Sequence, residues 1–376
     1  MKTPLVQPAA PTPTASVSEF IVTFAIVLAA IFGMLLFDTA LARVDSRERK
    51  AYATREFATA ERLMGEKKTS EAIDHLRSAT SLDADNSSYA TALAEAILED
   101  GRPDDANLIL GPVLERKPKD GAANLVMARV LARENRIEDA KAYYHTAIDG
   151  IWPAGAAARR LAARFELIDL LARTNEKPEL LAELLPIQED SSLDGDHRKL
   201  IAHLFVQAGS PARAVAIFRE FLRKNPGDVD AYVGLADAAL SLGDLSTGRN
   251  DLIAAQKLLP DTTAMKARIG VVDSAVALDP TQTGLALAEQ ARRSRVLLQL
   301  TVDAVQKCLG KQAPDVAPAL DSIRPMLLSH APAEGQAQSI QQTISVAEQL
   351  WGLRRARCAP AADDTPLALV HNRIGH

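Results

Sequence analysis

The chain has 376 residues, of which 43 are Lys or Arg and 48 are Asp or Glu, so its formal net charge at pH 7 is −5. This mild balance excludes the strongly basic class of nucleic-acid-binding proteins, whose affinity depends on neutralising phosphates. Alanine and leucine are abundant, whereas aromatic residues make up only 4% of the chain. Such a composition favours helices, because Ala and Leu lose little rotamer freedom there. We therefore expect an all-α protein.

The N-terminal region predicts a tail followed by a membrane segment. Residues 1–19 are polar and contain four prolines, a composition that cannot bury a core and predicts disorder. An apolar run of 18 residues without a charged side chain follows, from Phe20 to Phe37. As a helix it would span roughly 27 Å, close to the hydrocarbon thickness of a bilayer. The run predicts a transmembrane anchor over residues 20–37.

Two features leave the processing and the orientation of this segment open. Ala40-Leu41-Ala42 has the small-x-small form that signal peptidase accepts. The apolar run is longer than a usual signal core, however, and Lys2 is the only cationic side chain before it, so an uncleaved anchor is favoured. By the positive-inside rule, the cations after the run place the following domain in the cytoplasm: Arg43, Arg47, Arg49 and Lys50. An N-terminal anchor more often exports the domain that follows it, and the two signals conflict.

A 34-residue period runs through the middle of the chain. It is defined by six marker residues: Ala72, Ala106 and Ala140, then, after six additional residues, Leu180, Ala214 and Gly248. The additional residues fit the turn-rich stretch Ile151–Ala156. Three prolines lie twelve residues after a marker, where a second helix should end: Pro118, Pro226 and Pro260.

Residue classes also recur around each marker. A large residue lies four positions after every marker, and an apolar residue lies nine positions before it. The residue twelve positions before is small in five repeats and is Ile168 in the fourth. Five positions before the marker, repeats two to six carry residues that tolerate the left-handed conformation of a turn between helices: Gly101, Asn135, Asn175, Gly209 and Gly243.

On these residues the chain resembles the tetratricopeptide repeat (TPR) family over about residues 53–262, within an array of about six helix pairs that we expect over 43–262. The family's usual Trp in the first helix is absent, aliphatic residues replace its usual Tyr, and the fourth repeat diverges most. The resemblance implies a right-handed superhelical solenoid of antiparallel helix pairs, with a concave groove lined by the first helices. It implies no particular partner.

The same resemblance implies which side chains line this groove. Charged residues eleven positions before each marker, with three cations nearby, form the candidate partner-binding set: Glu61, Glu95, Arg129, Arg133, Asp169, Arg173, Lys199, His203 and Asp237. A groove with acidic ends and a basic middle suggests a partner segment of mixed charge. Reversing the charges of Arg129 and Arg133 is expected to weaken its binding.

Beyond Pro260 the period weakens, but helical patterns persist over 264–278, 284–309, 316–330 and 335–357. We expect residues 263–358 to form helices that cap the solenoid or dock a partner, and residues 359–376 to form a tail. Cys308 and Cys358 lie near the ends of two expected helices, and an up-down-up arrangement would bring them together as a disulfide. Two free thiols in a cytoplasmic protein are the alternative. Together with the small-x-small motif, the pair favours a periplasmic soluble domain.

No catalytic or cofactor signature accompanies the repeats. The seven histidines form no metal-ligand spacing, and the chain has no phosphate-binding loop or nucleophile elbow. We expect no enzyme activity, no cofactor and no metal, and no nucleic acid among the partners. The architecture is similar to that of bacterial assembly factors held in the inner membrane by one N-terminal anchor.

The expected function is therefore that of a single-pass, membrane-anchored protein–protein interaction scaffold, which recruits partners for assembly of an envelope complex. Partners would bind through the groove and through the C-terminal helices. The alternative is a permanent structural subunit of a larger membrane complex.

Overall fold

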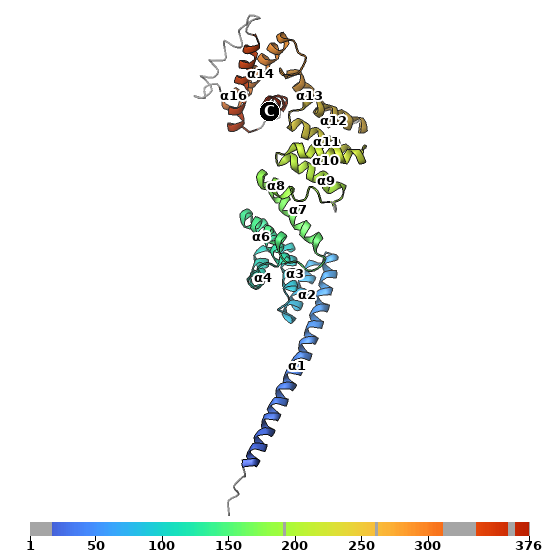
Figure 1. The fold of residues 1–376 in the computed structure, drawn as a ribbon, viewed down its shortest axis with the longest axis vertical. Coiled ribbons are helices and arrows are strands. Elements are labelled where there is room, and N and C mark those ends of the chain that lie inside the picture. The colour runs from blue at the N-terminus through green and yellow to red at the C-terminus, as the bar shows by residue number, and fades with distance from the viewer. Residues whose placement is uncertain (1–16, 191–192, 260–261, 311–335, 360–364, 376) are drawn as a thin grey trace, which may run out of the picture. The chain divides into compact units, whose positions relative to one another are not determined.

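The computed structural model of the protein describes residues 17–190, 193–259, 262–310, 336–359 and 365–375. These residues form sixteen α-helices and no β-strand (Figure 1). The chain divides into two compact units, Met1–Leu167 and Ile168–His376.

The first unit contains three antiparallel helix pairs and the beginning of a seventh helix. The pairs are α1 (Val17–Gly65) with α2 (Thr69–Leu82), α3 (Ser87–Glu99) with α4 (Pro103–Arg116), and α5 (Gly121–Arg133) with α6 (Ile137–Asp149). The boundary between the units falls within α7 (Ala157–Thr174).

The second unit continues the pairs with α8 (Lys177–Leu184), α9 (Gly195–Gln207), α10 (Pro211–Lys224), α11 (Val229–Ser241) and α12 (Leu245–Leu258). It ends with α13 (Thr263–Leu278), α14 (Leu287–Leu309), α16 (Gln336–Arg357) and α17 (Thr365–Ile374). The helices expected at 264–278, 284–309 and 335–357 are thus present with small shifts of their ends. The helix expected at 316–330 lies outside the described residues.

The marker residues lie where the two helices of each pair pack together. Five of them have no exposed surface and Gly248 is also buried. The residues twelve and nine positions before each marker and four positions after it are all buried, including Ile168 and the wholly buried Phe218. A small side chain lets the backbones approach, and the larger apolar side chains fill the space between them. The helix-pair arrangement expected from the period is confirmed.

The turn inside each of the six pairs passes through one residue with a positive φ. These residues are Lys67 (60°), Gly101 (82°), Asn135 (59°), Asn175 (59°), Gly209 (77°) and Gly243 (74°). Glycine and asparagine adopt this left-handed conformation at the least cost, which explains five of the six positions. Lys67 was not predicted, because nothing in its residue type indicates a turn.

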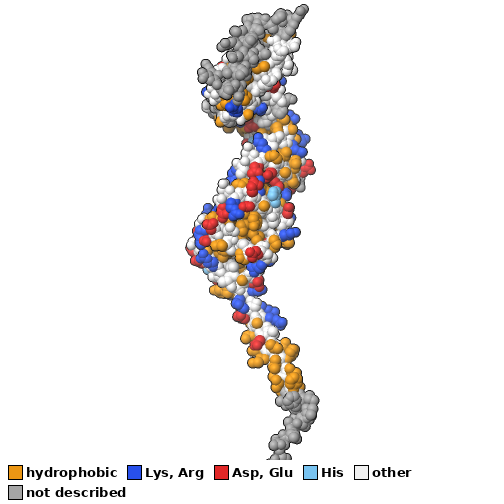
Figure 2. Space-filling view, turned by 90° about the vertical axis from the view of Figure 1, so that its left-hand side faces the viewer, with side chains coloured by type: hydrophobic (Ala, Val, Ile, Leu, Met, Phe, Trp, Pro, Cys, Tyr) orange, Lys and Arg blue, Asp and Glu red, His pale blue; other side chains and the backbone are white. Residues whose placement is uncertain are grey.

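Helix α1 joins the apolar segment to the first helix pair without a break. From Phe24 to Phe37, every large apolar side chain is at least half exposed, and these side chains form the orange stretch just above the grey lower end in Figure 2. In length and composition, this helix is able to cross a membrane. Further along α1, Ala53, Ala60 and Leu63 are buried where the helix packs against α2. Of the tail expected over 1–19, residues 1–16 lie outside the described residues, and 17–19 belong to α1.

The prediction of a tail over 359–376 is wrong for Thr365–Ile374, which form α17. Leu367 and Val370 are buried in the apolar core of the second unit. The side-chain amide of Asn372 donates to the carbonyl oxygens of Leu240 (3.1 Å) and Ser241 (2.9 Å) at the end of α11. A helix of ten residues is marginal by itself. Its stability here comes from packing against α11 and α13, which a local pattern does not reveal.

A disulfide joins Cys308, in the last turn of α14, to Cys358, the residue after α16, and the two Cα atoms are 6.3 Å apart. The two helices also pack against each other along their length. The bond therefore closes the chain around residues 309–357 and restrains the end of this helix pair.

Candidate partner-binding groove

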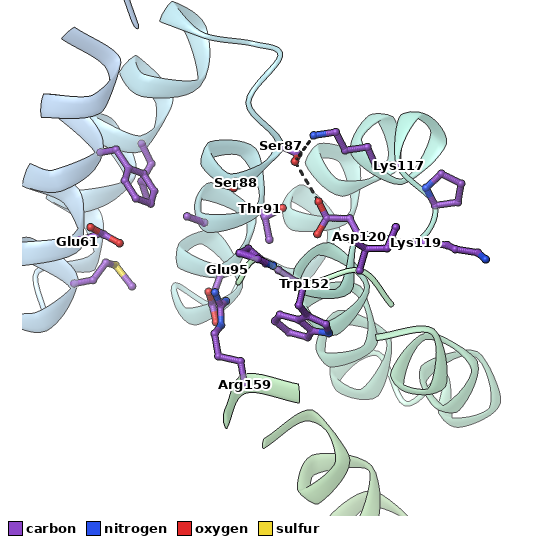
Figure 3. Close-up of a pocket in the computed structure, with 18 of the residues that line it drawn as sticks. Glu61, Ser87, Ser88, Thr91, Glu95, Lys117, Lys119, Asp120, Trp152 and Arg159 are labelled. Atoms are coloured by element: carbon purple, nitrogen blue, oxygen red, sulfur yellow. Dashed lines mark hydrogen bonds between the residues drawn. The ribbon is translucent and has the colours of Figure 1, made fainter. Parts of the chain in front are cut away.

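A cavity of about 1230 Å³ in the first unit lies between the first helices of its pairs. Helix α1 contributes Phe57, Glu61 and Met64 to one wall, and α3 contributes the floor (Figure 3). The opposite wall consists of the residues before α5 and the loop before α7. We call this cavity the N-terminal groove.

The six-residue insertion builds part of this wall. The backbone N–H of Ile151 donates to the carbonyl oxygen of Lys119 (2.7 Å), and the N–H of Gly121 donates to the carbonyl oxygen of Ile151 (2.9 Å). The indole N–H of Trp152 donates to the carbonyl oxygen of Ala147 (2.8 Å). The insertion is therefore fastened to α6 and to the residues before α5, and it holds a half-buried tryptophan at the groove.

The absence of a side chain at Gly121 makes room for this tryptophan. A Cβ atom at Gly121 would lie 2.3 Å from the indole nitrogen of Trp152, which is far inside van der Waals contact. The guanidinium carbon of Arg159 lies 5.4 Å from the centre of the Trp152 ring, a cation–π distance. One face of the ring is thus covered by a cation at the rim of the groove.

A short hydrogen-bonded chain lies at the base of the same wall. The ammonium group of Lys117 donates to the hydroxyl of Ser87 (3.0 Å), which donates to a carboxylate oxygen of Asp120 (3.1 Å) (Figure 3). The other oxygen of Asp120 accepts from the backbone N–H of Ala123 (3.2 Å) and caps the start of α5. The cap and the chain together fix the position of Lys117.

Thr91 lies on the floor of the groove and is 4% exposed. Its hydroxyl is buried and has no hydrogen-bond partner within the part of the chain that the structure describes. A buried hydroxyl without a partner costs free energy in the unbound protein.

The predicted groove residues fall into different environments. Glu61 and Glu95 line the N-terminal groove. Arg129 forms ion pairs with Glu95 (2.6 Å) and Glu166 (2.7 Å), and its hydrogen bonds to Glu166 raise its pKa. Its charge is thus neutralised within the protein. Replacing it by Glu would break these pairs, so weaker partner binding by such a variant would not by itself place Arg129 at the interface.

Arg133, Asp169, Arg173 and Lys199 are each engaged in contacts within the protein. The guanidinium of Arg133 donates to the carbonyl oxygen of Leu98, and the exposed Asp169 pairs with Arg173 (3.0 Å). In the second unit, Lys199 lies 3.0 Å from a carboxylate oxygen of Asp228, and this hydrogen bond raises the pKa of the lysine.

His203 and Asp237 line a second cavity, of about 780 Å³, in the second unit. Asp237 forms an ion pair there with Arg268. The edge of the His203 ring packs against Phe218, and its Nε2 lies 3.5 Å from Asp230. Residues of α16 and α17 line the same cavity, so the C-terminal helices occupy space beside the first helices of this unit.

Sequence reasoning missed several residues of the N-terminal groove: Phe57, Ser87, Thr91, Lys117, Asp120, Trp152 and Arg159. The insertion was the available signal, because an extra turn-rich stretch with one of the two tryptophans of the chain interrupts an otherwise regular period. Among the described residues, no cluster of three or more His, Cys, Asp or Glu side chains is placed to hold a metal ion.

Comparisons with known proteins identify the repeats. Tetratricopeptide repeat models match residues 98–150 and 200–258. A comparison with curated protein sequences finds no match.

Solved structures of TPR proteins are similar to the chain at low identity. YrrB, a TPR protein with an unusual peptide-binding site, has 15% identity and a TM-score of 0.42, and the match covers 51% of this chain and 96% of YrrB. PilW, a type IV pilus biogenesis factor, has 17% identity and a TM-score of 0.42, and the match covers 58% of this chain and 98% of PilW. The C-terminal part of a TPR protein from Cytophaga hutchinsonii has 13% identity and a TM-score of 0.46, and the match covers 65% of this chain and 95% of that structure.

Proposed function

We propose that this tetratricopeptide-repeat protein is a membrane-anchored scaffold that binds a segment of a partner protein in the N-terminal groove. Its role would be to recruit that partner during assembly of a membrane or envelope complex. TPR proteins mediate protein–protein interactions, and the groove has the size of a site for a short peptide segment.

The continuity of α1 is the observation that supports this proposal best. The same helix carries the exposed apolar segment and contributes Phe57, Glu61 and Met64 to the groove. Phe57 follows Phe37 by 20 residues, which corresponds to about 30 Å of helix. A partner bound in the groove would therefore be held at a fixed distance from the membrane.

We further propose that the soluble part lies on the periplasmic side of an inner membrane, with residues 20–37 as a single uncleaved span. The disulfide between Cys308 and Cys358 supports this side, because disulfides persist in oxidising compartments and are rare in the cytosol. Thiol labelling tests it. A membrane-impermeant maleimide should modify neither cysteine in intact spheroplasts, and should modify both after reduction. Labelling that requires lysis of the spheroplasts would place the domain in the cytoplasm.

Site-specific crosslinking in native membranes tests the partner-binding role. A photoreactive amino acid at Ser88, an exposed position in the groove, should capture one defined protein, and the additional substitution Trp152→Ala should abolish that product. The same photoreactive residue at the exposed Glu115 on α4, which is not among the residues that line the groove, serves as the control. Equal capture from both positions would contradict the groove as the binding site.

The alternative, a permanent structural subunit, predicts a different result. A partner would then co-purify at a stoichiometric ratio in detergent, and Trp152→Ala would leave that ratio unchanged, because the C-terminal helices would make the contact.

A further inference from the structure

The walls of the N-terminal groove differ in charge, which bears on the chemistry of the proposed partner. Glu61 on α1 is exposed and has no ion pair or hydrogen bond within the described part of the chain, and neither has Glu99 at the end of α3. Lys117 stands on the opposite side, where its ammonium group donates to the hydroxyl of Ser87, which in turn donates to the Asp120 carboxylate (Figure 3). Among the described residues Lys117 makes no direct ion pair. The groove thus presents unpaired carboxylates on α1 and at the end of α3, and an ammonium group on the opposite wall.

Apolar surface lies between these charges. Phe57 and Met64 on α1 are half-buried, and so is Trp152 in the insertion. The Phe57 ring rests against Tyr89, with ring centres 4.9 Å apart, and the Trp152 ring is fixed by its hydrogen bond to Ala147. Aromatic side chains held in this way offer a preformed apolar surface, which costs little conformational entropy on binding.

Thr91 provides an independent sign of a missing ligand. Thr91 lines the groove, and its hydroxyl is buried and has no hydrogen-bond partner among the described residues. A native protein rarely keeps such a group unless something satisfies it in the functional state. A peptide backbone lying on the floor of the groove offers both a donor and an acceptor for this hydroxyl.

We propose that the N-terminal groove takes an extended partner segment in which a large apolar side chain lies between a basic and an acidic side chain. The apolar side chain packs between Trp152 and Phe57. The basic side chain faces Glu61, the acidic one faces Lys117, and the segment's backbone hydrogen-bonds to Thr91. The inference rests on the proposed function and specifies the chemistry of its partner.

Synthetic peptides test the charge pattern with the full chain in detergent micelles. The probes are labelled nonapeptides with a central Phe, flanked by Lys and Glu in either order, by two Lys, by two Glu or by two Gln. In fluorescence anisotropy, one of the two mixed peptides should bind at least about fivefold more tightly than all the others. Tightest binding by the two-Lys, two-Glu or two-Gln peptide, or no binding up to millimolar concentration, would overturn the proposal.

A charge reversal checks the assignment of Glu61. Glu61→Lys should weaken binding of the preferred mixed peptide at least about fivefold and should improve binding of the two-Glu peptide. The matched control is Glu115→Lys, which makes the same change on an exposed position of α4 and should leave both affinities unchanged. Equal effects of the two variants would show that only net charge matters and would contradict a defined site.

Thr91→Val separates binding from folding. Valine has the shape of threonine without the hydroxyl, so the unbound variant should unfold at the same temperature as the wild type or higher. Peptide affinity should nevertheless fall roughly three- to tenfold, and Thr91→Ser should keep most of it. Wild-type affinity in Thr91→Val would show that the hydroxyl takes no part in binding.

The two levels of the proposal can fail separately. If the Ser88 crosslink captures a partner in membranes but no mixed-charge peptide is preferred, the scaffold role stands and the assigned chemistry is wrong. If the mixed-charge preference holds but no partner is captured in membranes, the groove chemistry stands and the proposed scaffold role is wrong.

Discussion

Gly121 packs so closely against Trp152 that a single added methyl group should displace the indole from the wall of the groove. Gly121→Ala would place a Cβ atom 2.3 Å from the indole nitrogen. The indole would have to move and would lose its hydrogen bond to Ala147. We expect the unfolding free energy of the first unit to fall by about 1–3 kcal/mol and the Trp152 fluorescence to shift to longer wavelength.

Gly65→Ala is the matched control for this substitution. Gly65 is the last residue of α1, and a Cβ atom there would meet nothing within 4 Å. Alanine favours a helix over glycine by up to about 1 kcal/mol. The control variant should therefore be as stable as the wild type or more stable, and a loss equal to that of Gly121→Ala would argue against the close contact.

His371 makes the second unit sensitive to acid. Its ring is buried, stacks on Trp351 with centres 4.9 Å apart, and is hydrogen-bonded through Nε2 to the hydroxyl of Thr301 (2.9 Å). Burial, with the nearby charge of Arg355, lowers the pKa of His371 to about 4. In the unfolded chain the pKa of histidine is about 6.5, so the unfolded state takes up the proton first as the pH falls.

The contribution of neutral His371 to the unfolding free energy should therefore be fully present above about pH 7 and should decline between pH 6.5 and 4. Linkage predicts that at pH 5 this group alone has lowered the unfolding free energy by about 2 kcal/mol. Urea unfolding followed by Trp351 fluorescence in a Trp152→Phe background measures the change. In His371→Gln the decline should be smaller by the same amount, and an unchanged pH dependence would show that His371 is not the group responsible.

At the scale of elements, we expect the six-residue insertion to be needed for binding in the groove but not for folding of the helix pairs. The pairs around it are stabilised by their buried marker residues, whereas the insertion contributes Ile151, Trp152 and Pro153 to the wall of the groove. Deleting residues 151–156 restores the 34-residue period.

We expect this deletion variant to keep its helical content, because loops of a solenoid tolerate changes in length. Its crosslink from Ser88 and its binding of mixed-charge peptides should be lost. Circular dichroism and anisotropy measure the two properties on one sample. Retained binding in a folded deletion variant would exclude the insertion from the site.

At the scale of the whole molecule, the disulfide between Cys308 and Cys358 closes a loop with a sequence separation of 50 residues. In the chain-entropy model, a crosslink over such a loop stabilises by about 4 kcal/mol. Replacing both cysteines by serine should therefore lower the unfolding free energy of the second unit by several kcal/mol. Denaturant unfolding followed by Trp351 fluorescence measures this.

A reducing agent is the internal control for that measurement. It should destabilise the wild type to the level of the double serine variant and should leave the variant itself unchanged. An unfolding midpoint that is equal in wild type and variant under oxidising conditions would show that the disulfide does not form in the protein.

The sequence by itself determined the features that depend on neighbouring residues along the chain. The apolar run from Phe20 to Phe37, the six helix pairs and the turns at Gly101 or Asn135 all follow from local residue type and a fixed period. In a repeat solenoid each unit contacts mainly its neighbours, so a local pattern is sufficient to predict such pairs.

Only the tertiary structure decided the features that depend on distant residues. α17 is held by contacts with α11 and α13, which lie more than 80 residues earlier in the chain. Arg129 is neutralised by Glu95 and Glu166. Trp152 reaches the groove because Ile151 pairs with the backbone before α5. The period places Glu95 and Arg129 at equivalent positions, but neither their ion pair nor the contacts of α17 and Trp152 can be recognised from residue type alone. The lining of the groove therefore depends on the tertiary structure.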